Sequence, residues 1–66
     1  MSENAKRIYC DLLSNEIVSM FGVSKERAVA AVNKSAIQTL IRENPDYVDH
    51  VPLSCWAEEV HAEMFA

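Results

Sequence analysis

The residues best suited to chemistry lie near the end of the chain, where Glu58 and His61 form a Glu-x-x-His motif. On a helix, this spacing places a carboxylate and an imidazole on one face, where the pair can bind a metal ion. A site for two metal ions in a helical bundle needs two such motifs and two further glutamates. This chain has one motif, so a second copy and Glu16 would have to supply the other ligands. We therefore expect Glu58 and His61 to be solvated neighbours without a metal.

Two histidines and two cysteines are the other metal-ligand types in the chain: His50, Cys55, His61 and Cys10. They show neither a Cys-x-x-Cys pair nor the spacing of a zinc finger or knuckle. The N-terminus lacks the apolar core of a signal peptide, so we expect a cytoplasmic chain with both thiols reduced. Cys10 is then expected to fill the core as a small apolar side chain.

The sequence offers little else for catalysis or cofactor binding. Gly22 is the single glycine, so a glycine-rich phosphate loop is excluded, and no serine, histidine and aspartate fall at a spacing that indicates a triad. A helical bundle of this length leaves little room for a ligand pocket of even about 300 Å³ beside its core. We expect a protein that is not an enzyme and holds no cofactor.

Length and composition indicate one small folded domain over residues 1–66. Half of the residues are hydrophobic, but a chain this short buries only roughly 60% of the surface that its unfolded form exposes. Its stability is therefore expected to be small or shared with a partner. No apolar run approaches the roughly 20 residues that a membrane-spanning helix needs, so no membrane contact is expected.

The charges are divided along the sequence. All six lysines and arginines precede position 43, together with four acids, whereas six acids and no lysine or arginine lie from Glu43 onward. The two parts therefore carry formal charges of +2 and −6. This division predicts head-to-tail pairing, in which the basic edge of one copy meets the acidic residues 43–63 of another.

Apolar residues recur at helical spacing in three segments, over about residues 3–21, 24–43 and 53–65. Gly22 suits a left-handed helix end, and Ser24 is a suitable N-cap two residues later. Pro45 and Pro52 bound a turn region at residues 44–52, because proline disfavours helical geometry in the residue before it. The sequence thus predicts an all-α fold, a small three-helix bundle.

The corner between the first two helices, IVSMFGVSKERAVAAVNKS, resembles the helix-turn-helix of lac-repressor-type regulators. The matching residues are Gly22, Val23, Ser24, Val32, Asn33 and Ser35. This resemblance implies an alternative function as a helix-turn-helix-like nucleic-acid-binding or transcription-auxiliary protein, with phosphate contacts from Lys25, Arg27 and Lys34.

Several residues depart from that pattern. Val18 replaces the small residue that lets the two helices close, and Ala28 and Ala31 are smaller than the usual inward residues. The expected reading face, Lys25, Glu26, Val29 and Ala30, offers a single useful donor to base edges. The second helix is also predicted to be longer than a recognition helix, and the chain as a whole is acidic. Nucleic-acid binding is therefore the alternative and not the main expectation.

The same corner also resembles that of ubiquitin-associated three-helix domains, in which a Met-Gly turn precedes an alanine-rich helix. Here Phe21 separates Met20 from Gly22. The resemblance extends to the helix corner alone and implies no binding residues.

Large apolar side chains remain as candidates for a surface that contacts protein. The candidate interface residues are Tyr9, Met20, Phe21, Trp56, Met64 and Phe65. Trp56 also suits the core, whereas Phe65 lies one residue from the end of the sequence and is harder to bury within one copy. We expect a small non-enzymatic protein-interaction or assembly module whose partner is a second copy of itself, in a homodimer.

Overall fold

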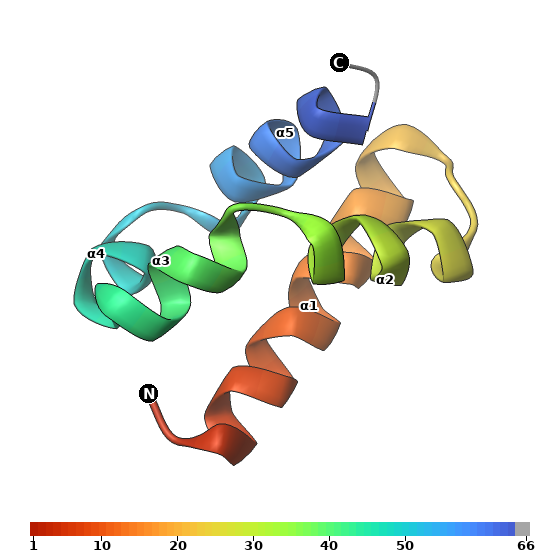
Figure 1. Ribbon diagram of the computed structural model, residues 1–66. Coiled ribbons are helices and arrows are strands. Elements are labelled where there is room, and N and C mark those ends of the chain that lie inside the picture. Colours follow the sequence, from red (N-terminus) through yellow and green to blue (C-terminus); the bar gives the residue numbers. More distant parts are fainter. Residues whose placement is uncertain (65–66) are drawn as a thin grey trace.

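The computed structural model describes residues 1–64 and contains five α-helices in this range (Figure 1). They are α1 (Glu3–Phe21), α2 (Lys25–Lys34), α3 (Ile37–Glu43), α4 (Pro45–His50) and α5 (Leu53–Met64). No strand occurs in the described range. The predicted all-α fold is therefore confirmed, but the count of three helices is wrong.

The corner between α1 and α2 forms as the sequence predicts. Gly22 adopts the left-handed conformation with φ 70°, and its amide donates to the Val18 carbonyl at 2.9 Å. The Ser24 hydroxyl accepts a hydrogen bond from the Arg27 amide at 3.2 Å. One helix thus ends and the next begins within three residues, because glycine tolerates the positive φ and serine satisfies a free amide.

The predicted helix over residues 24–43 is broken in two at Ser35, whose backbone is extended. The Ser35 hydroxyl donates to Glu63 Oε1 at 2.6 Å and accepts from the Ile37 amide at 3.1 Å. The Ala36 amide donates to Glu63 Oε2 at 3.2 Å. A serine that bonds nearby backbone amides competes with helix continuation, and here a carboxylate from α5 supports the break.

The predicted turn region at residues 44–52 also needs correction, because it contains the six-residue helix α4. Pro45 occupies the first turn of α4, where the missing amide hydrogen costs nothing. The Trp56 indole donates to the Val48 carbonyl at 3.0 Å and thereby fastens α4 to α5. The last predicted helix matches α5 as far as Met64, and Phe65 lies outside the described residues.

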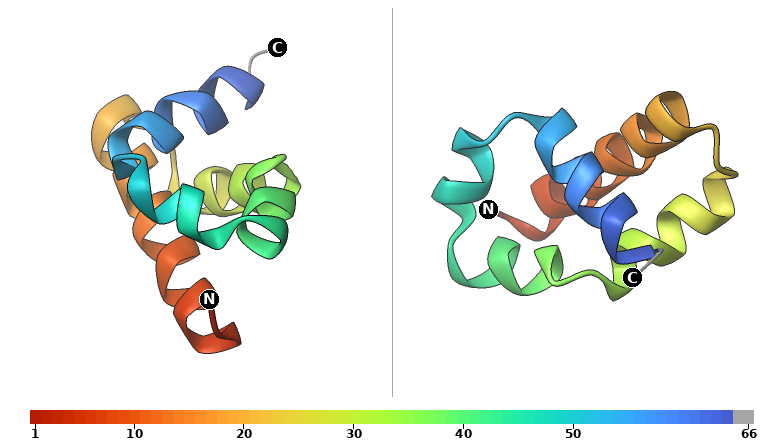
Figure 2. Two further views of the ribbon diagram at one scale, coloured as in Figure 1. Left: turned by 90° about the vertical axis from the view of Figure 1, so that its left-hand side faces the viewer. Right: turned by 90° about the horizontal axis from the view of Figure 1, so that it is seen from above.

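In the two views of Figure 2, α5 crosses α1. All five helices contribute buried apolar residues: Leu13, Ile17, Ala28, Val32, Ile37, Ile41, Val48, Trp56, Ala57 and Val60. The Phe21 and His61 rings stack with their centroids 3.6 Å apart, which joins the C-terminal end of α1 to α5. In the described residues, no helix has the length and apolar character to cross a membrane.

The Glu63 contacts generate a first prediction. Glu63→Ala removes the acceptor of the Ser35 hydroxyl and the Ala36 amide, so we expect a loss of about 1–3 kcal/mol in the free energy of unfolding. Thermal denaturation followed by circular dichroism measures it. Glu59→Ala, which removes an exposed carboxylate from the same helix, is the control and should have little effect. Equal stability of the two variants would contradict the role assigned to Glu63.

Candidate interaction groove

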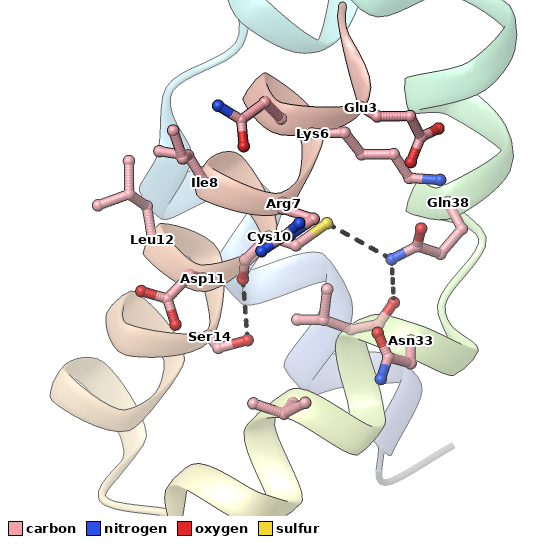
Figure 3. Close-up of a pocket in the computed structure, with 13 residues that line it drawn as sticks. Glu3, Lys6, Arg7, Ile8, Cys10, Asp11, Leu12, Ser14, Asn33 and Gln38 are labelled. Atoms are coloured by element: carbon pink, nitrogen blue, oxygen red, sulfur yellow. Dashed lines mark hydrogen bonds between the residues drawn. The ribbon is translucent and has the colours of Figure 1, made fainter.

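A groove lies between the first half of α1 and the α2–α3 segment (Figure 3). Its volume is about 700 Å³. It is lined from α1 by Glu3, Asn4, Lys6, Arg7, Ile8, Cys10, Asp11, Leu12 and Ser14, and from the other side by Val29, Val32, Asn33 and Gln38. The groove exceeds the pocket size expected from the sequence because it is open between helices instead of enclosed in the core.

A small polar network forms the base of the groove. The Gln38 side-chain amide donates to the Val32 carbonyl at 3.0 Å and to Cys10 Sγ at 3.6 Å. The Ser14 hydroxyl donates to the Cys10 carbonyl at 2.9 Å. The Val32 carbonyl also accepts from the Ser35 amide at 3.3 Å, so Gln38 adds a second hydrogen bond to it and, through Cys10, joins α3 to α1.

One edge of the groove is apolar and exposed. Ile8 is 56% exposed, Leu12 is 50% exposed, and Val29 on the opposite wall is 37% exposed. Leu13 and Ile17, on the other face of α1, are fully buried. The helix therefore carries apolar residues on two faces and buries one of them.

Charged side chains also line the groove, and Figure 3 shows Lys6 and Glu3 on the side of α1 that faces Gln38, opposite Ile8 and Leu12. Lys6, Arg7, Glu3 and Asp11 lie along the α1 wall. Lys25 Nζ bonds Asp11 Oδ1 at 2.9 Å and also contacts Asn15 Oδ1, which ties α2 to α1. Both charges of this pair are exposed, so the pair adds at most about 1 kcal/mol. The groove is thus lined by two cations, Lys6 and Arg7, and by two acids, Glu3 and Asp11, of which Asp11 is paired with Lys25.

The aromatic interface candidates from the sequence do not gather on one surface. Trp56 is only 8% exposed and belongs to the core. Phe21 stacks on His61, and Tyr9 packs against the core with its hydroxyl buried.

The remaining interface candidates are methionines and Phe65. Met20 is 39% exposed in the last turn of α1. Met64 lines a second groove of about 380 Å³ between α2 and α5, and Phe65 lies outside the described residues. Ile8 and Leu12 are exposed but were not among the predicted interface residues. Each adjoins another apolar residue in the sequence, so both fit the pattern of a buried helix face.

The three cations proposed for nucleic-acid contact lie on α2 and are exposed. Lys25 is engaged by Asp11, whereas Arg27 and Lys34 line the second groove beside Glu63 and Met64. Because α2 ends at Lys34, the length argument against a recognition helix is wrong. The acidic and apolar residues of the expected reading face, Glu26, Val29 and Ala30, are exposed as anticipated.

The candidate metal ligands are dispersed. Within residues 1–64, no three histidine, cysteine, aspartate or glutamate side chains lie close enough to hold a metal ion. The His61 ring is stacked on Phe21, and His50 Nδ1 lies 2.9 Å from the Asp46 carbonyl oxygen. Cys10 and Cys55 are free thiols.

Comparison of the chain with protein-family models, with curated proteins and with solved structures finds no match.

The buried Tyr9 hydroxyl generates a second prediction. It has no hydrogen-bond partner among the described residues, and an unpaired buried hydroxyl costs about 1–3 kcal/mol. Tyr9→Phe should therefore preserve or raise the free energy of unfolding at neutral pH. Tyr47→Phe, which removes an exposed hydroxyl, is the control and should leave it unchanged. Clear destabilisation by Tyr9→Phe in urea denaturation would contradict this assignment.

Tyr9 also makes a prediction at alkaline pH. Burial, with smaller contributions from the charges of Asp49 and Cys10, raises its pKa to about 12 from an ordinary value of 10.0. The folded state thus disfavours the phenolate more than the unfolded state does. The stabilising effect of this pKa shift on the free energy of unfolding is present in full below pH 10 and is lost as the pH rises to about 12. Urea denaturation across this range should show a smaller loss of stability for Tyr9→Phe than for the unaltered protein, and equal losses would contradict the assignment.

Proposed function

We propose that this protein is a non-enzymatic interaction module that acts by self-association. The observation that carries the proposal is the exposure of Ile8 and Leu12 on the outer face of α1, beside an open groove. Single exposed apolar residues are common on protein surfaces, but clustered ones with a polar rim mark contact sites.

The energetics of a short chain favour association at this surface. Full burial of one leucine or isoleucine side chain contributes about 1.5–3 kcal/mol. Ile8 and Leu12 are each about half buried in one copy, so covering them releases roughly half of that amount for each residue. This gain in free energy is large compared with the small free energy of unfolding expected of a 66-residue fold.

The distribution of charge supports a second copy as the partner. Exposed acids lie on the later helices and their connections: Glu43, Asp46, Asp49, Glu58 and Glu59. Lys6 and Arg7 line the same groove as the exposed apolar residues of α1. Opposite charges on two surfaces of the same molecule favour contact between copies and fix its orientation.

A nucleic-acid-binding function is the second candidate, and the short α2 after a tight corner favours it. In this case Arg27 and Lys34 would contact phosphates, and Lys25 would have to leave Asp11. Phosphate contacts weaken with salt, so this function predicts binding to random duplex DNA at low ionic strength that is lost at high ionic strength. Absence of binding at low ionic strength would eliminate it.

Sedimentation equilibrium over a concentration series tests self-association. We expect a mass above that of one chain at high micromolar concentration. Leu12→Ser should weaken association about tenfold, because it removes an apolar contact of about 1.4 kcal/mol. Met20→Ser, which alters another exposed apolar residue of α1 away from the groove, is the matched control. A monomer at all concentrations in both low and high salt would refute the proposal.

A further inference from the structure

The short helix α4 presents an exposed aromatic ring among acids. Tyr47 is 51% exposed and lies edge-on to Trp56, with the ring centroids 5.8 Å apart. Asp46 and Asp49 flank it in sequence, and both are exposed. The contact with Trp56 holds the tyrosine ring in place, so little side-chain freedom is lost when a partner covers it.

The position of α4 is also fixed. The Trp56 indole donates to the Val48 carbonyl, and the Val48 side chain is fully buried. In Figures 1 and 2, α4 lies at the end of the molecule away from the α1–α2 corner. A rigid, exposed aromatic residue at an edge has the character of residues that dominate binding energy in protein interfaces.

The groove has the complementary character. Ile8, Leu12 and Val29 offer an apolar surface for a ring, and Lys6 and Arg7 provide positive charge elsewhere along the same groove. None of the residues that line the groove belongs to α4. The α4 helix of the same copy therefore leaves the groove free, and each copy presents both surfaces at once.

From these observations we propose that the groove of one copy receives α4 of a second copy. Tyr47 packs against Ile8 and Leu12, and the acids around Tyr47 face Lys6 and Arg7. This inference rests on the proposed self-association and specifies the two surfaces that carry it. Because two different surfaces meet, the contact is heterologous and joins copies head to tail into a ring or an open chain.

A heterologous contact predicts that two defective variants repair each other. The groove variant, Ile8→Ser with Leu12→Ser, keeps an intact α4. The α4 variant, Asp46→Lys with Asp49→Lys, keeps an intact groove. Alone, each should associate at least about tenfold more weakly than the unaltered protein. Mixed in equal amounts, they should form a dimer of one copy of each, detected by native mass spectrometry with one variant isotopically labelled.

Control variants and a folding check distinguish loss of the contact from effects of altered charge or of unfolding. Glu26→Lys with Glu59→Lys produces the same change in charge on α2 and α5 and should associate like the unaltered protein. Circular dichroism checks that each variant is folded, and Tyr47→Ser provides a second α4 variant that leaves the charge unchanged.

Two outcomes distinguish this inference from the proposed function. If the unaltered protein is monomeric, the proposed self-association fails, and this pairing fails with it. If the unaltered protein associates but the mixed variants form no mixed dimer, self-association stands and this pairing is wrong. The latter result is expected if two α1 helices pair through their outer faces.

Discussion

The hydrogen bonds that the Glu63 carboxylate accepts from Ser35 and Ala36 are the contacts on which the rest of the structure depends. They support the break between α2 and α3, where the chain leaves the helical direction that its apolar pattern would continue. The break brings Gln38 to the carbonyl of Val32 and beside Cys10 on α1. The α1–α3 side of the groove and the placement of α4 beyond α3 both follow from this change of direction.

Local features of the fold could be predicted from the sequence because their causes lie within a few residues. The Gly22 and Ser24 corner is the clearest case, since one residue permits a positive φ and the other satisfies a nearby amide. The break at Ser35 could not be predicted in the same way. Its carboxylate partner lies 28 residues away in sequence, and apolar residues continue at helical spacing on both sides of the break.

The candidate site was harder to predict, because exposure depends on which face of α1 the other helices cover. Ile8 adjoins Tyr9 and Leu12 adjoins Leu13, so the sequence pattern alone does not tell which residue of each pair is buried. Trp56 was among the predicted interface residues because its side chain is large and apolar, but it is buried in the core. The separation of basic and acidic residues is visible in the sequence. The hydrogen bonds that Glu63 accepts from Ser35 and Ala36 could not be predicted from it.

The central claim is that α4 of one copy occupies the groove of another, and paramagnetic relaxation between copies tests it most directly. A spin label is attached at His50→Cys, at the exposed end of α4, in a chain whose Cys10 and Cys55 are replaced by serine, and this chain is mixed with ¹⁵N-labelled protein. The account predicts selective broadening of the amide signals of Ile8, Leu12 and Val29. Broadening confined to other surfaces, or none while the protein is associated, would contradict it.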